Sequence, residues 1–275
     1  LLLYMKYISG EITQLSCEYF VGTPEDFQFN PKIRNCTERF VFLDNNKAEI
    51  TASKVFCYTH CLENVNIVNT LLKFTTKFEL FCHNSDTNFD KKFLYLFKKV
   101  PNLLHIHTQN MNVSDTRISP LPIGFANSMW PCGNRDIIEK YLPLSEQKKT
   151  NTVFFNFKIK TNRTERKRCF KFFNKMGIPF LGRMNPDTYF KTLASYKYAV
   201  CPPGAGIDTH KFWECLYYKV IPIVKRCVLT EYYSKQYEMI LVDDWEKLTK
   251  DSKLSHLWPT LEGFIDSEFW LNVDS

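Results

Sequence analysis

Short apolar runs alternate with stretches of helical periodicity along the first half of this 275-residue chain. Strands are predicted at the apolar runs 54–58, 78–82 and 103–107, and helices at the amphipathic stretches 63–74 and 91–99. Two weaker strand signals precede them at 15–21 and 39–43. Strands that alternate with helices are typical of an α/β domain built on a parallel sheet.

The pattern starts afresh after a polar run at 144–150, so we place a domain boundary near residue 145. The first domain then spans 1–145 and the second 146–275, with the last helix expected to pack back on the first domain. In the second domain strands are predicted at 153–157, 178–181, 198–201, 220–224 and 239–242. Helices are predicted at 163–175, at 187–194 and from Asp244 onward.

The segment 201–214 contains two of the nine glycines of the chain and joins a predicted strand to a helical pattern. Glycine lets backbone N–H groups approach a phosphate closely, and a helix N-terminus adds donors and partial positive charge. His210 and Glu214 are four residues apart and therefore share one face of that helix. We interpret Glu214 as an acceptor for ribose hydroxyls; the alternative is a capped helix with a solvated polar face.

The net charge of +7 suits an anionic ligand. The candidates are a nucleotide diphosphate, an acidic glycan and nucleic acid, and the charge does not choose among them. Arg163 and Arg166 begin the helix after the first strand of the second domain, where they could clamp a diphosphate. The alternative is an exposed basic helix face. The phenylalanines follow core periodicity and are not interleaved with the basic residues, so we expect no nucleic-acid partner.

Polar residues follow the predicted strands of the first half, where open α/β sheets place their ligands. His83 and Asp86 follow the strand at 78–82, and Gln109 and Asn110 follow the strand at 103–107. We interpret Asp86 and His83 as candidates for a catalytic base. The alternative for Asp86 is local capping of the helix that follows it.

The ten cysteines form no CxxC pair, which argues against a zinc site, and several lie inside apolar strands as buried thiols would. We therefore expect a reducing compartment, the cytoplasm (that of the host if the protein is viral). No run of about 18 apolar residues is present, so we expect no transmembrane segment. A location in the Golgi lumen would require an anchor upstream of Leu1.

The motifs together resemble the exostosin-type glycosyltransferases, glycosyltransferase family 47. The matching stretches in the second half are 156–157, 161–166, 198–214, 222–224 and 242–245, and those in the first half are 83–86, 109–110, 122–124 and 127–128. The match covers roughly residues 78–250 and is most specific at 206–210. The resemblance implies a GT-B fold, which consists of two Rossmann-like domains facing across a cleft.

It also implies inverting transfer of a sugar from a UDP-sugar to a hydroxyl of a glycan acceptor. The residues expected at the donor nucleotide are Asn156, Arg163, Arg166, Gly204, Gly206, Asp208, Thr209, His210 and Glu214. Gln109, Asn110 and Asn127 are expected on the acceptor side. The chain contains no Asp-x-Asp pair, so we expect no metal and no cofactor beyond the UDP-sugar co-substrate.

The chain departs from the large vertebrate exostosins because it is short and has a single module. Short members of the family occur in large DNA viruses of algae and in microbes, and UDP-xylose is accordingly our choice of donor. A GDP-sugar donor is the alternative within the same class. A catalytically inactive module that binds a nucleotide or a glycan is the alternative of another class.

Overall fold

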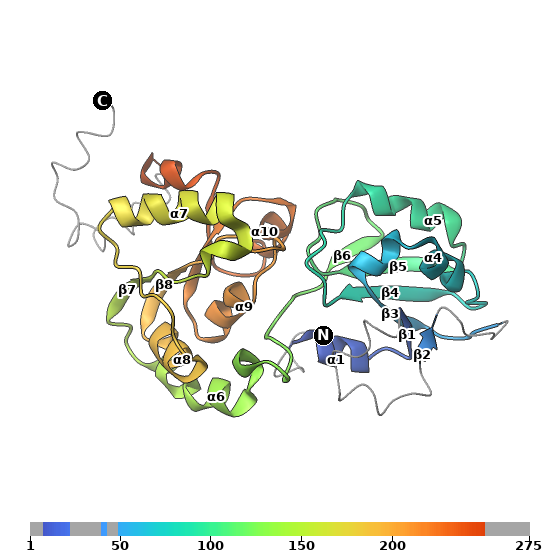
Figure 1. Ribbon diagram of the computed structural model, residues 1–275, viewed down its shortest axis with the longest axis horizontal. Coiled ribbons are helices and arrows are strands. Elements are labelled where there is room, and N and C mark those ends of the chain that lie inside the picture. The colour runs from blue at the N-terminus through green and yellow to red at the C-terminus, as the bar shows by residue number, and fades with distance from the viewer. Residues whose placement is uncertain (1–7, 23–39, 43–48, 251–275) are drawn as a thin grey trace. The chain divides into compact units, whose positions relative to one another are not determined.

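The computed structural model describes residues 8–22, 40–42 and 49–250, which divide into two compact units (Figure 1). The first unit comprises the chain up to Asn134 together with Gly206–His210, and the second comprises 135–205 and the chain from Lys211 onward. The division thus falls at 134/135, where the sequence predicted about 145. The segment Gly206–His210, predicted in the second domain, belongs to the first unit. The expected last helix lies outside the described residues.

All described strand pairs of the first unit are parallel, and they form one sheet in the order β2-β1-β3-β4-β5-β6. The strands are β1 (Tyr19–Gly22), β2 (Phe40–Phe42), β3 (Lys54–Tyr58), β4 (Phe78–His83), β5 (Leu103–Thr108) and β6 (Ile118–Pro120). The helices are α1 (Gly10–Leu15), α4 (Val65–Leu71) and α5 (Leu96–Lys99), with 3₁₀ turns at Thr59–Glu63, Lys91–Tyr95 and Pro131–Gly133. The chain passes from β1 to β2 on one side and then to β3 on the other side of β1, so the topological switch point lies between β1 and β3.

The predicted strands at 54–58, 78–82 and 103–107 are confirmed. The signal at 15–21 is divided, because α1 ends at Leu15 and β1 begins at Tyr19. The side chain of Ser9 caps α1 by accepting a hydrogen bond from the Ile12 N–H at 3.4 Å. The short strand β6 ends in a proline and was not predicted.

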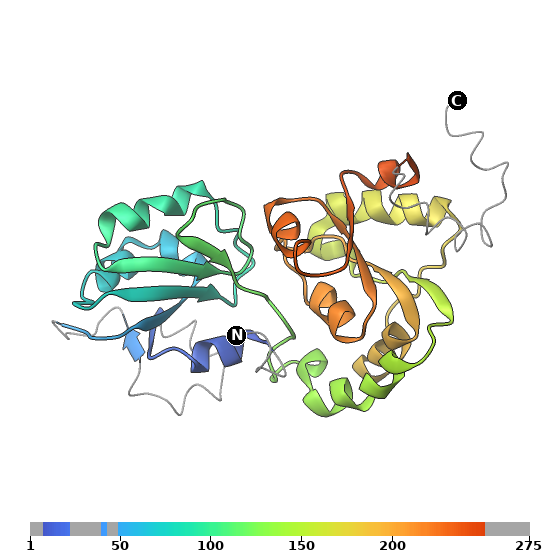
Figure 2. The same cartoon turned by 180° about the vertical axis from the view of Figure 1, so that it is seen from behind.

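The second unit has a parallel sheet in the order β10-β9-β8-β7. Its strands are β7 (Asn151–Phe154), β8 (Tyr196–Val200), β9 (Ile221–Lys225) and β10 (Ile240–Val242). Its helices are α6 (Arg135–Lys140), α7 (Arg163–Lys175), α8 (Pro186–Ala194), α9 (His210–Tyr217) and α10 (Val228–Tyr233), and 3₁₀ turns lie at Leu142–Glu146, Ile159–Asn162 and Trp245–Lys250. Figures 1 and 2 show α7 on one face of this sheet and α8 and α9 on the other.

Alternate side chains of β7 and the residue after it pack on opposite faces of this sheet. Phe155 contacts the ring of Phe173 on α7, whereas Phe154 contacts the ring of Tyr189 on α8. The predicted strand at 178–181 is wrong. This segment belongs to no strand: the Ile178 N–H donates to Phe173 and the Leu181 N–H to Phe155. It is apolar because the Phe180 ring packs among other phenylalanines of the core.

Both units are therefore mixed α/β structures with parallel sheets, which confirms the expected fold class at that level and is compatible with a Rossmann-like architecture. Over the described residues, every helix is too short or too polar to cross a bilayer.

Candidate functional site

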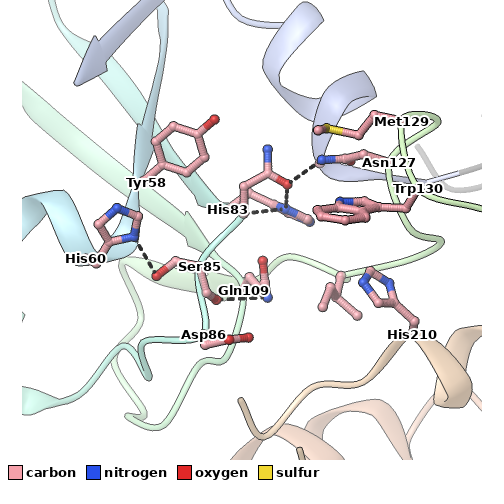
Figure 3. A pocket seen from close by; sticks show the side chains of 13 residues that line it. Tyr58, His60, His83, Ser85, Asp86, Gln109, Asn127, Met129, Trp130 and His210 are labelled. Atoms are coloured by element: carbon pink, nitrogen blue, oxygen red, sulfur yellow. Dashed lines mark hydrogen bonds between the residues drawn. The ribbon is translucent and has the colours of Figure 1, made fainter. Parts of the chain in front are cut away.

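A pocket of about 440 Å³ opens in the first unit at the carboxyl ends of β3, β4 and β5 (Figure 3). Ligands of open parallel sheets bind at this end, beside the switch point. The lining residues are Gly10, Tyr58, His60, His83, Asn84, Ser85, Asp86, Gln109, Ile123, Asn127, Met129, Trp130 and His210. Predicted catalytic and acceptor-side residues therefore meet here, although Asn110 is buried behind the wall.

Two asparagines shape this pocket with backbones in the left-handed region. Asn84 follows β4 and has a φ of 54°, and Asn110 lies just beyond β5 with the same φ. Such conformations cost free energy in residues other than glycine and concentrate at functional sites. Gly10 approaches Asn84 so closely that a Cβ would lie 1.7 Å from the amide oxygen. The wall of the pocket therefore has no space for a side chain in place of Gly10.

His83 is buried, and both of its ring nitrogens have partners. The Asn84 backbone N–H donates to Nδ1 at 2.7 Å, so Nε2 carries the proton and donates it to the Pro122 carbonyl at 2.9 Å. Burial lowers the pKa of His83 to about 4, against hydrogen bonds to Pro122 and Asn84 that raise it. This geometry does not support the interpretation of His83 as a catalytic base, because both ring nitrogens are already engaged by the protein.

The burial of His83 predicts a specific loss of stability in mild acid. The folded protein keeps this ring neutral down to about pH 4, whereas the unfolded chain takes up a proton near its ordinary pKa of 6.5. Protons therefore favour the unfolded state as the pH falls through this window. The difference between a pKa of 6.5 in the unfolded chain and about 4 in the folded protein corresponds to a loss of about 3 kcal/mol in the free energy of unfolding. Urea unfolding between pH 7 and 4 measures it.

The matched variant for this measurement is His83→Gln, whose amide can still donate to Pro122. It should lack most of the wild-type loss between pH 6.5 and 4.5, whatever its stability at pH 7. Equal slopes in the two proteins would contradict the assignment.

Asp86 is exposed at the pocket, and its carboxylate has no hydrogen bond or ion pair among the described residues. The capping expected as its alternative role is absent, because the next helical turn begins at Lys91 with Asp90 at its N-cap, and the nearby Thr87 N–H donates to Ser85 Oγ at 3.2 Å. The same hydroxyl lies 3.1 Å from Nδ1 of His60. Since no structural task in the described fold needs the Asp86 carboxylate, it is available to a ligand.

Gln109 and Asn110 both donate to the Ser85 carbonyl, at 3.0 and 2.9 Å, and so hold the loop that carries Asp86. Asn110 is fully used, because its Oδ1 also accepts from the Asp208 N–H. Gln109 differs: it is 2% exposed, and its Oε1 has no partner in the described part of the chain. In Figure 3 that oxygen points into the pocket. A buried acceptor left unpaired is costly unless a ligand or water satisfies it.

Asn127 lies on the opposite wall, where its Nδ2 donates to Asn84 Oδ1 at 3.2 Å and its Oδ1 accepts from the Glu11 N–H at 2.9 Å. The buried Glu11 carboxylate accepts in turn from the backbone and hydroxyl of Ser128. Asn127 thus positions the wall through α1, and it lines the pocket as the sequence predicted for an acceptor-side residue.

The segment Gly206–His210 packs in the first unit, and this corrects its predicted place in a nucleotide turn of the second domain. Both oxygens of Asp208 are occupied: Oδ2 accepts from the Ile123 N–H at 2.8 Å and Oδ1 from the Thr209 N–H at 2.9 Å. A Cβ at Gly206 would lie 2.5 Å from the Asn110 amide. Asp208 and Gly206 therefore hold this segment in place against Asn110 and the backbone of Ile123, which lie 98 and 85 residues before Asp208.

His210 ends this segment and lines the pocket with its half-buried ring. Its Nδ1 lies 2.7 Å from the carbonyl of Gly124, a glycine with a φ of 61°. A nitrogen that faces a carbonyl must carry the proton, so the neutral ring has its lone pair on Nε2. His210 consequently belongs to the pocket of the first unit and not to the predicted phosphate turn.

Arg166 in the second unit clamps protein backbone where the sequence predicted a diphosphate. Its guanidinium donates to the carbonyls of Pro203, Lys158 and Pro202 at 2.9, 2.8 and 3.3 Å. The Gly204 carbonyl accepts from Asn162 at 3.0 Å. Arg163, by contrast, is exposed and has no partner among the described residues. Of the two arginines, Arg163 is the one that remains available.

Two further donor-site predictions lie on structural contacts. Asn156 donates its amide N–H to the carbonyl of Gly182. Glu214 is 4% exposed, and its Oε2 accepts from the Tyr189 hydroxyl at 2.6 Å. Burial, and then the charge of Glu214, raise the pKa of Tyr189 well above its ordinary value. The predicted ribose role is therefore not supported by this geometry.

Removal of the Glu214 carboxylate should destabilise the fold, because the Tyr189 hydroxyl would lose its partner in a buried setting. Glu214→Ala is expected to lower the free energy of unfolding by at least about 1 to 3 kcal/mol. Tyr189→Phe and Glu214→Gln, combined in a double-mutant cycle by urea unfolding, measure the coupling between the two groups. Additive effects in that cycle would contradict the assigned contact.

Lys211, the second residue of α9, carries a buried charge without a hydrogen-bond partner. The residue is partly exposed as a whole, but its Nζ is shielded from solvent and has no partner among the described residues. The ammonium lies 5.4 and 5.8 Å from the ring centroids of Phe154 and Phe157. Burial lowers the pKa of Lys211; the Glu214 carboxylate opposes this shift and Arg166 adds to it.

No group of three or more His, Cys, Asp or Glu side chains that could hold a metal occurs within residues 8–22, 40–42 and 49–250. None of the protein-family models matches this chain, and a search of curated proteins finds no similar sequence. The resemblance to the exostosin type therefore stays a hypothesis, which the geometry of the two units has to support by itself.

Sequence reasoning did not select Tyr58, His60, Trp130 or Lys211. Tyr58 and His60 lie at the end of β3, and the strand-end rule that selected Asp86 would have found them. Lys211 on α9 packs against the ring of Phe154 on β7, which is distant in the sequence, so no local sequence signal identifies Lys211.

Proposed function

We propose that this protein is an inverting glycosyltransferase that moves a sugar from a UDP-sugar to a hydroxyl of a glycan acceptor, without the help of a metal ion. The observation that carries this proposal is the buried amino group of Lys211 at the start of α9, which has no hydrogen-bond partner among the described residues. A buried cation is costly unless it is paired, and an anionic ligand at this helix N-terminus would pair it.

On the donor side, the diphosphate of the nucleotide takes Lys211 and Arg163 as its cations. Backbone N–H groups of Gly204 and Ala205 donate to no described residue and can add hydrogen bonds. Arg166 and Asn162 serve this turn indirectly, because they bind its carbonyls and so fix its shape. These groups stabilise the negative charge that builds on the departing UDP.

On the acceptor side, Asp86 acts as the general base. Its carboxylate takes the proton of the attacking hydroxyl while the acceptor oxygen forms a bond to the anomeric carbon. The bond from that carbon to the diphosphate oxygen breaks in the same step, and the electron pair leaves with UDP. Attack on the face opposite the leaving group inverts the anomeric configuration.

The proposal includes a GT-B arrangement of the two α/β units, membership of the exostosin type, and UDP-xylose as the donor. A GDP-sugar is the alternative donor.

The experiment is a turnover assay with purified protein, in which nucleotide release is followed from UDP-xylose, UDP-glucose, UDP-galactose, UDP-N-acetylglucosamine and GDP-fucose. We expect release from at least one UDP-sugar, with the same rate in EDTA because neither an Asp-x-Asp pair nor a metal-holding group occurs in the described chain. Release from the GDP-sugar alone would contradict the choice of a UDP-sugar as the donor. A protein that bound no nucleotide at all would contradict its assignment as a glycosyltransferase.

A further inference from the structure

The pocket of the first unit differs from the rest of the protein in its charge. The chain carries a net charge of +7, yet no lysine or arginine is among the residues that line this pocket. Its only carboxylate is that of Asp86, and the His83 ring is held in its neutral form by two backbone partners. An anionic ligand would find no lysine or arginine here.

The polar groups of the pocket are instead those that bind hydroxyls. The Gln109 Oε1 is a buried acceptor without a partner in the described chain and points into the pocket (Figure 3). Asn127 and Asn84 add amide groups, and Nε2 of His210 adds an acceptor. Several neutral donors and acceptors at fixed positions suit a ligand with several hydroxyl groups.

One side of the pocket is a large aromatic surface. The indole of Trp130 is 57% exposed, and Met129 beside it is 40% exposed. The backbone of Trp130 is fixed on both sides, because its N–H donates to Asn127 at 2.9 Å and its carbonyl accepts from Gly133 at 2.8 Å. A Cβ at Gly133 would lie 2.1 Å from the Asn127 carbonyl, so this turn requires glycine.

An exposed indole on a fixed backbone, beside a polar wall, offers the two kinds of surface that a sugar ring needs. The C–H face of a pyranose can stack on the indole while its hydroxyls reach the amides. A pocket of about 440 Å³ is within the range of small-ligand sites. We propose that this pocket binds an uncharged sugar ring stacked on Trp130, with a hydroxyl donating to Gln109 Oε1, and that acidic sugars are excluded.

The role of this ring as the acceptor rests on the proposed function, since Asp86 in the same pocket would then take its proton. Binding of the sugar ring does not depend on the proposed function, because it requires no residue of the proposed nucleotide-sugar site in the second unit. A pocket that binds an uncharged ring excludes acidic glycans as ligands, although the net charge of the chain alone would allow them.

The test is saturation-transfer NMR on the full chain with three probes: methyl β-xyloside, methyl β-galactoside and methyl β-glucuronide. At least one neutral glycoside should bind and the glucuronide should not. Trp130→Ala and Gln109→Leu should each weaken the binding by about tenfold. The matched control is Tyr232→Ala, which removes an aromatic side chain that is 38% exposed in the second unit and should leave the binding unchanged.

Binding of the glucuronide alone, or binding that both pocket variants leave unchanged, would overturn the inference, as would the absence of binding by either neutral glycoside. A UDP titration of the same samples separates the two proposals. UDP binding without sugar binding would overturn the pocket and leave the donor site standing. Sugar binding without UDP binding would overturn the transfer reaction and leave the pocket standing.

Discussion

Asp86→Asn is expected to lower the rate of sugar transfer by about a thousandfold, because the amide cannot accept the proton of the acceptor hydroxyl. The affinity for UDP should stay at the wild-type value, since Asp86 has no part in the donor site. The fold should be unaffected, because the carboxylate has no partner among the described residues and Asp90, not Asp86, is the N-cap of the helical turn that follows. Initial rates at saturating donor, together with calorimetric UDP titration, measure both quantities.

The control for this variant is Asp90→Asn, the same substitution four residues later, outside the pocket lining. Asp90 accepts a hydrogen bond from Asn112 at 2.8 Å on the exposed surface, so its replacement should change the transfer rate by less than about threefold. Transfer by Asp86→Asn at the rate of this control would assign the base to another residue. His210, which lines the pocket and has its Nδ1 on the Gly124 carbonyl, would then be the next candidate.

Lys211→Met should have opposite effects on ligand binding and on stability. UDP binding should weaken by about a hundredfold, or roughly 3 kcal/mol, because the diphosphate loses a desolvated cation. The free energy of unfolding of the ligand-free protein should rise by about 1 kcal/mol, because a thioether replaces a buried charge against the same two rings. Calorimetric titration and urea unfolding measure the two changes.

This pair of signs distinguishes a binding role from a structural one. Were Lys211 only a packing residue, its replacement would lower stability and leave the affinity for UDP intact. Lys197→Met is the matched control, since Lys197 is exposed on β8 of the same sheet and has no partner among the described residues. It should change neither quantity measurably.

The α/β class and most of the elements could be predicted from sequence because their signals are local. The helix predicted at 163–175 and the strand predicted at 54–58 match α7 and β3. The segment 178–181 misled for an equally local reason, since an apolar run marks burial but not pairing. Phe180 is partly buried against three other phenylalanine rings and belongs to no strand ladder.

The candidate site could be predicted only in part, and the failures share one physical cause. His83 and Asp86 were correctly placed at a strand end, but only the structure shows that Pro122, 39 residues away, occupies the ring of His83. Asp208 was interpreted through its neighbours in the chain, while its Oδ2 partner lies 85 residues away at Ile123. Contacts of this range leave no periodicity in the sequence.

The central claim is that the second unit binds a nucleotide diphosphate, and the most direct test is a calorimetric titration of the full chain with UDP. We expect one UDP per chain, no comparable heat with CMP, and loss of the UDP signal in Lys211→Met but not in Lys197→Met. Absence of UDP binding to the wild-type chain, or equal binding to the two variants, would contradict the account.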